Sequence, residues 1–171
     1  MSDLSDKEES DIVDALSKLE PGLLPKKVFY SIARLVVTPT YVVVPFLVFE
    51  HITYIHLTRR VLDDVDFPGM LCPIGKIILA SDVPLEDTFH RLWSGEISNI
   101  TIKKGPVFVN SIFDKITRGK EISLIHWVLL NDKPTVGELY DIQSLPINEI
   151  PATDVTRLRL AINHFTENEL Q

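Results

Sequence analysis

Apolar positions recur first at helical spacing and later in long strand-like runs. Between Asp11 and Leu19 the apolar residues fall three or four apart, which is the pattern of an amphipathic helix, and Pro21-Gly22 ends it. Residues 1–10 are polar and acidic, so we expect them to be disordered. The pattern separates an N-terminal segment, 1–25, from a domain that spans 26–171.

Strand-forming residues dominate the first part of that domain, where Val, Ile, Phe, Tyr and Thr are frequent. Pro39 and Pro45 lack a backbone donor and indicate bends or edges. We predict strands at 28–37 and 41–49, with a turn at 38–40 between them. Further strands are expected at 52–58, 76–79, 107–112, 122–130 and 138–142, and helices at 84–94 and 152–165. This order predicts a single α+β domain, a mixed β-sheet with flanking helices.

The helix that begins near Pro84 has clear signals. Asp82 is placed to cap its free backbone donors, and Pro84 fits the first turn. Leu85, Phe89 and Leu92 form one apolar stripe, and Glu96 continues it. A carboxylate on such a stripe either leaves the core at a frayed end or faces a cavity that holds a cation.

Composition limits the classes of function. The chain has 171 residues and a net charge of −7, which disfavours nucleic-acid binding. Its single cysteine, Cys72, excludes an internal disulfide. The acidic start is unlike a secretory leader, and the longest apolar run, 35–49, is too short and too interrupted for a membrane span. We expect a cytoplasmic protein without a membrane partner.

The segment from Gly75 to Glu96 resembles the signature of Nudix hydrolases. That signature is a glycine, five residues, a glutamate, seven residues, then Arg-Glu, an apolar residue, any residue and Glu-Glu. Aligned on Gly75 and Arg91, the family's loop glutamate is Ser81, and the spacing to Arg91 is longer by two residues. Leu92 stands at the next glutamate, and of the last two only Glu96 remains.

The order of the remaining elements supports this resemblance. A strand at 121–130, a GELYDIQSLP segment at 137–146 and a closing helix follow as in the family. The pair Arg91-Leu92, with Glu96 five residues after the arginine, is also similar to the GDP-mannose mannosyl hydrolases. The resemblance implies an α/β/α sandwich of Nudix type and a ligand that is a nucleoside diphosphate linked to another group, with a sugar as one candidate.

The same resemblance implies roles for five residues. Glu96 would bind Mg²⁺ or Mn²⁺, and Arg91 would orient Glu96 or a nearby carbonyl group. Arg59, Arg60 and Gly75 would border the bound phosphate. The alternatives are a solvated Glu96 at a helix end, an exposed Arg91, and surface ion pairs of Arg59 and Arg60 with Asp63 and Asp64.

Two functions are compatible with these features of the sequence. The first is a divergent metal-dependent hydrolase of nucleoside diphosphate derivatives. The second is a catalytically inactive Nudix-like module that binds a nucleotide or a protein partner, since each lost carboxylate removes an oxygen ligand for magnesium. A homodimer is compatible with either function.

Overall fold

The computed structural model describes residues 4–97 and 100–170. The helices are α1 (Asp6–Leu16), α2 (Lys26–Ala33), α3 (Glu86–Glu96) and α4 (Ala152–Glu169), with a short 3-10 helix at Ile147–Glu149. The strands are β1 (Val37–Phe49), β2 (Ile52–Arg59), β3 (Leu71–Cys72), β4 (Ile74–Ile77), β5 (Ile102–Ile116), β6 (Gly119–Leu130) and β7 (Glu138–Asp141).

The strands form one mixed sheet with the order β3-β2-β1-β6-β5, in which β4 also pairs with β1 and β7 with β2. β1 and β6 pair in parallel, whereas the other pairs are antiparallel. The predicted mixed sheet is therefore confirmed. The expected strands at 52–58, 122–130 and 138–142 correspond closely to β2, β6 and β7.

Strand β1 is the centre of the sheet and corrects one expectation. The predicted turn at 38–40 is wrong, because β1 runs without interruption from Val37 to Phe49. Pro39 pairs in register with Ile122 of β6, and its carbonyl oxygen accepts a bond from the Ile78 N–H. A proline removes only a donor, so its carbonyl still joins the sheet to the chain after β4.

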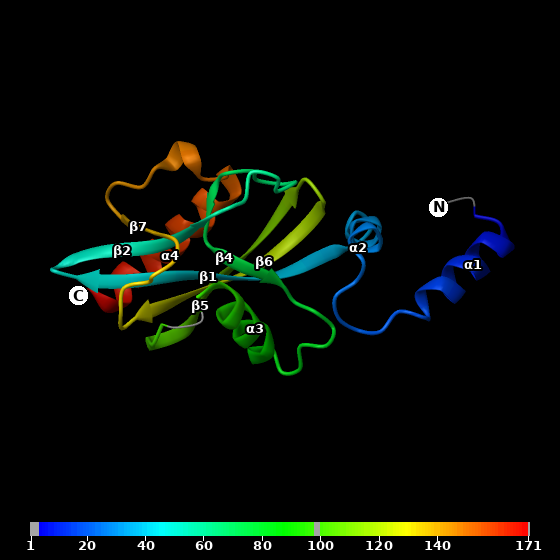
Figure 1. Cartoon of the computed structure of the whole chain (residues 1–171), viewed down its shortest axis with the longest axis horizontal. Helices are drawn as coiled ribbons and strands as arrows, with labels where there is room; N and C mark the ends of the chain where they lie inside the picture. Colours follow the sequence, from blue (N-terminus) through cyan, green and yellow to red (C-terminus); the bar gives the residue numbers. More distant parts are fainter. Residues whose placement is uncertain (1–3, 98–99, 171) are drawn as a thin grey trace.

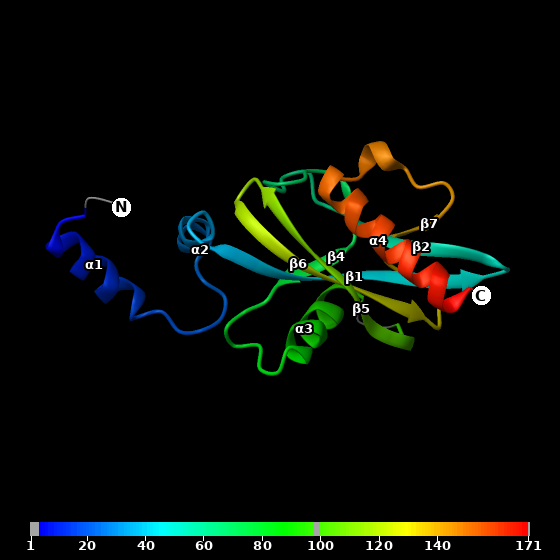
Figure 2. The same cartoon turned by 180° about the vertical axis from the view of Figure 1, so that it is seen from behind.

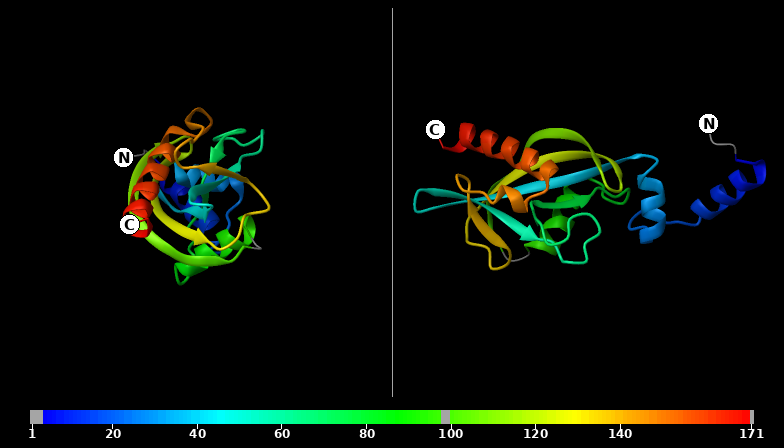
Figure 3. Two further views of the ribbon diagram at one scale, coloured as in Figure 1. Left: turned by 90° about the vertical axis from the view of Figure 1, so that its left-hand side faces the viewer. Right: turned by 90° about the horizontal axis from the view of Figure 1, so that it is seen from above.

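Two helices cover opposite faces of the sheet (Figures 2 and 3). On one face, Val155, Leu158 and Phe165 of α4 pack against strand residues that include Phe46 and Trp127. On the other face, Phe89 and Leu92 of α3 pack against residues of β1 and β6. The α/β/α sandwich predicted from the sequence is thus confirmed.

The N-terminal part differs from its prediction in two ways. Residues 1–3 lie outside the described residues, but from Asp6 the chain is helical rather than disordered, because Ser5 and Glu8 form a capping box. The predicted strand at 28–37 is wrong, since 26–33 form α2. Figure 1 shows α1 extending away from the sheet, with α2 between them.

None of the helices in residues 4–97 and 100–170 combines the length and the apolar character that crossing a membrane requires.

Candidate functional site

The connection from β4 to α3 is fixed by a buried carboxylate. Asp82, whose side chain is 6% exposed, accepts bonds from the Leu79 N–H, the Thr88 hydroxyl and the Arg91 guanidinium, the last at 2.5 Å. Arg91 also donates to the carbonyl oxygen of Ile77 at 2.8 Å. The sequence predicted that Asp82 caps backbone donors of α3, but among the described contacts its side chain makes no such bond. It ties the helix side chains to the preceding loop.

Arg91 accordingly contacts a different carboxylate from the one predicted. Among the described contacts, its guanidinium binds Asp82 and the Ile77 carbonyl oxygen, and none joins it to Glu96. The reason lies in helix geometry, since residues five apart on a helix do not share a face, whereas Asp82 approaches from the loop. The carbonyl alternative for Arg91 does agree with the structure.

Asp82→Asn tests this anchor. Hydrogen bonds from Arg91 hold the pKa of Asp82 well below its usual range. A carboxyl group with a lowered folded-state pKa stabilises the fold above its unfolded pKa, and this stabilisation is lost as pH falls through the folded pKa. We expect the variant to lose about 1–3 kcal/mol of unfolding free energy at pH 7, and less below about pH 4. Urea unfolding measures the loss of unfolding free energy at pH 7 and at pH 3, and the exposed Asp87→Asn is the control. An equal loss at the two pH values would contradict a stabilising role for the charge of Asp82.

Four of the five predicted site residues meet at one cavity. Arg59, Arg60, Gly75 and Glu96 all line a space of about 200 Å³, which we call the Glu96 cavity. Gly75 lies in β4 rather than in a loop, and a Cβ atom there would stand 3.3 Å from the Tyr41 carbonyl oxygen. Close approach of β4 to β1 therefore favours glycine at this position.

The two arginines of this cavity differ in their contacts. Arg59 donates to Glu138 at 3.1 Å, to the Gly69 carbonyl oxygen at 2.9 Å and pairs with Glu149 at 2.8 Å. Its guanidinium is thereby held at the surface. Arg60 has one described ion pair, a 3.9 Å contact with Asp64, and its side chain is 43% exposed. Arg60 is therefore the more available cation for an anionic ligand.

Glu96 faces a lysine. Its carboxylate lies 3.2 Å from Lys76 Nζ, and it ends α3, where the helix dipole disfavours an anion. Lys76 compensates for that charge. Mg²⁺ prefers several oxygen ligands in octahedral geometry, yet no three His, Cys, Asp or Glu side chains in 4–97 and 100–170 group as a metal site. The residues present do not fit a carboxylate-bound magnesium centre.

A second space adjoins the Glu96 cavity. This polar cavity, of about 260 Å³, shares Arg60, Asp64, Pro73 and Gly75 with it. Its charged lining consists of four cations and four acids: Arg60, Lys76, Arg118, Arg157, Asp64, Asp66, Glu121 and Asp154. The lining is thus balanced in charge.

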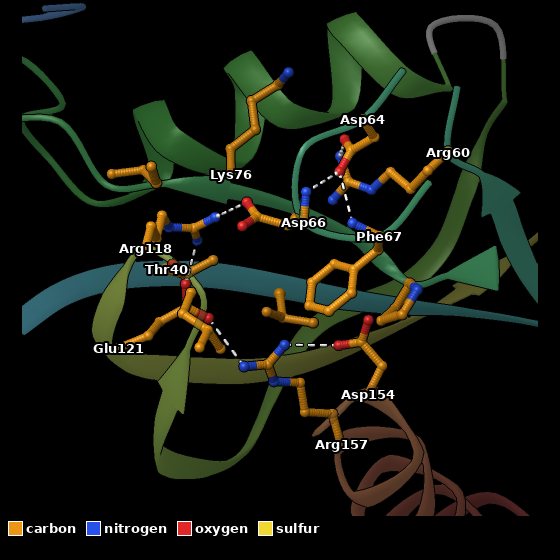
Figure 4. A pocket seen from close by; sticks show the side chains of 15 residues that line it. Thr40, Arg60, Asp64, Asp66, Phe67, Lys76, Arg118, Glu121, Asp154 and Arg157 are labelled. Carbon is orange, nitrogen blue, oxygen red and sulfur yellow. Dashed lines mark hydrogen bonds and ion pairs between the residues drawn. The ribbon is translucent and has the colours of Figure 1, made fainter. Parts of the chain in front are cut away.

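Arginines organise the acids of the polar cavity (Figure 4). Arg157 binds Asp154 at 2.6 Å and Glu121 at 2.9 Å, and all three side chains are almost completely buried. Arg118 pairs with Glu121 and, at 3.3 Å, with Asp66. Low dielectric strengthens such pairs and makes an unpaired member costly. These acids are therefore neutralised from within the chain.

Sequence reasoning missed this cluster. One available signal was the spacing of Asp154 and Arg157, which places both on the face of α4 that also carries buried apolar residues. The other was Glu121 at the start of the apolar strand β6. Neither signal indicates that the two elements meet.

Cys72 and His126 are two further side chains with reactive groups, and neither lines the two cavities. Burial raises the pKa of the Cys72 thiol to about 12, which keeps it protonated and unreactive. His126 stacks on Tyr41, with ring centroids 4.0 Å apart, and burial lowers its pKa. His126 lies in β6 and lines neither of the two cavities.

Solved structures provide the comparison. No protein-family model and no curated protein matches the sequence. The Nudix domain of Shewanella oneidensis NrtR, in complex with ADP ribose, superposes with a TM-score of 0.60 at 14% identity, covering 90% of this chain and 98% of that one. A MutT/Nudix family protein from Listeria innocua gives 0.59 at 15% identity, covering 78% and 96%.

The Ap4A hydrolase of C. elegans gives a TM-score of 0.57 at 11% identity, covering 76% of this chain and 98% of that one. These identities are low, but the matches include nearly the whole length of each neighbour. These structural matches agree with the observed architecture, in which a mixed sheet lies between α3 and α4. The chain has the Nudix fold.

Proposed function

We propose that this protein binds a nucleoside diphosphate derivative at the Glu96 cavity and does not hydrolyse it by a metal-dependent route. Support for binding comes from Arg60, which lines both cavities and has only a loose described ion pair. A charge-assisted bond from arginine to phosphate is among the stronger polar interactions. The phosphate would therefore lie beside Arg60, where the Glu96 cavity adjoins the polar cavity.

The observation that carries the proposal is the ion pair between Lys76 and Glu96. Glu96 is the one glutamate that remains of those in the family's signature, and a lysine ammonium stands 3.2 Å from its carboxylate. A divalent cation would have to displace that ammonium and would find few further oxygen ligands. In this proposal Lys76 takes the place of a metal as the positive charge beside the ligand.

The comparisons guide the choice of ligand. One neighbour was solved with ADP ribose and another is named as an Ap4A hydrolase. ADP-ribose is accordingly the first ligand to test, followed by Ap4A and by nucleoside diphosphate sugars, which the sequence resemblance suggested. A cytoplasmic location is part of this proposal.

A divergent hydrolase is the second candidate. It is favoured by the convergence of Glu96, Gly75 and Arg60 on one cavity. This candidate predicts turnover that requires Mg²⁺ or Mn²⁺ and that Glu96→Gln abolishes. The binding module predicts no such turnover, so the two candidates are separable.

Arg60→Met tests the binding site. The variant keeps much of the side-chain volume but removes the guanidinium, so we expect the Kd for ADP-ribose to rise about tenfold or more. Isothermal titration calorimetry with EDTA present measures it. Arg159→Met, an exposed arginine on α4 that lines neither cavity, is the matched control. Unchanged affinity in a folded Arg60→Met protein would contradict the proposed site.

A further inference from the structure

Helix α1 is amphipathic but buries nothing. Ile12, Val13 and Leu16 lie on one side of it and are 45%, 58% and 44% exposed, and none of its residues is buried. The helix has 11 residues, and isolated helices of that length are marginal in water. An apolar helix face this exposed indicates a surface that packs elsewhere.

An apolar groove lies beside α2. It has a volume of about 990 Å³, and its apolar lining includes Leu23, Leu24, Phe29, Ile32, Val36 and Leu79. Leu23 and Val36 are 84% and 52% exposed. One wall consists of residues 19–24 with α2, and the groove is also lined by residues 36–39, at the start of β1, and 76–80, in β4 and just after it. This α2 groove is larger than either cavity of the candidate site.

Charge is complementary between the helix and the groove. α1 carries five acidic residues and one lysine. Lys26 lines the groove, as does Glu20, while Lys27 lies in α2 and Arg34 follows it. α2 contains no acid, and none of the three cations has an ion pair in the part of the chain that the structure describes. Such complementarity orients partners and suppresses wrong ones.

We propose that α1 of one copy docks in the α2 groove of a second copy, and that the exchange is reciprocal. Each chain then supplies one acidic amphipathic helix and one groove beside the basic helix α2, which closes a two-fold dimer. The apolar side of α1 faces the groove, while its acids meet the cations of α2. This mode is helix-in-groove recognition.

The position of the connecting segment favours a second copy over the same chain. Leu16, at the end of α1, and Leu19 already line the edge of the groove, and α1 points away from it (Figure 1). The same chain's helix could enter only if residues 17–24 reversed direction, and 19–24 form the wall. The helix of another copy enters without disturbing that wall.

The test is the oligomeric state of the full chain and its variants. Sedimentation velocity over a concentration series should show a monomer–dimer equilibrium for the wild type. Val13→Asp on α1 and Leu23→Asp in the groove should each raise the dimer Kd about tenfold or more, the scale of losing a central apolar contact. Val136→Asp, at a valine 64% exposed and distant in sequence, should leave the Kd unchanged.

Mixing the two variants provides a sharper readout. A Val13→Asp chain keeps its groove and a Leu23→Asp chain keeps its helix, so a mixed dimer has one intact contact and should associate more tightly than either variant alone. A wild type that stays monomeric up to about 1 mM would overturn the proposal. So would a dimer that is insensitive to both substitutions, or a monomer in which hydrogen exchange shows α1 amides protected.

Discussion

Arg157→Met is expected to lower the free energy of unfolding by about 3–5 kcal/mol, the usual cost of removing one partner from a buried ion pair. Arg157 contacts Asp154, Glu121 and, at 3.3 Å, Asp114. Asp154 and Glu121 have side chains that are 5% and 2% exposed. Without the guanidinium, the negative charges of these carboxylates are less well neutralised in an environment that excludes water.

Chemical denaturation of wild type and variant at pH 7 gives this difference. Arg159→Met is the control, because Arg159 is exposed on the same helix, two residues away, and surface substitutions usually change stability by no more than about 0.5 kcal/mol. A loss for Arg157→Met that is no larger than the loss for Arg159→Met would show that the charge cluster does not hold α4 to the sheet.

Phe89→Ala should cost about 3–5 kcal/mol, the range for emptying a large aromatic side chain from a core. Phe89 is 7% exposed and packs near Tyr41 and Trp93, with ring centroids 6.2 and 5.6 Å away. Thermal or urea unfolding measures the loss, and His90→Ala, at the exposed next position, controls for helix propensity. A loss below about 1 kcal/mol would mean that α3 does not pack as described.

The sequence predicted the parts of the fold that depend on local pattern. Period and composition identified β2, β6, β7, α3 and α4, and the stripe of α3 correctly placed Phe89 and Leu92 in the core, although Leu85 is 40% exposed. Two local predictions failed for different reasons. Pro39 removes only one donor and does not interrupt β1, and Lys26–Ala33 has strand-like composition but forms α2, since β propensity is a weak preference.

The candidate site was predictable only in part. Arg60, Gly75 and Glu96 were predicted from the family resemblance, and the structure brings them to one cavity. Lys76, the partner of Glu96, and the pairing of Arg91 with Asp82 were not predicted. Both depend on how the loop before α3 folds over β4, and residue spacing along the chain does not encode that approach.

The most direct test of the proposed function is ³¹P NMR of ADP-ribose with the wild-type protein, before and after addition of Mg²⁺. If the protein binds ADP-ribose without hydrolysing it, the diphosphate resonances shift or broaden in the absence of metal, and no product resonances grow after magnesium is added. Phosphate product signals that appear only with magnesium, and that Glu96→Gln abolishes, would contradict this expectation and establish the hydrolase instead.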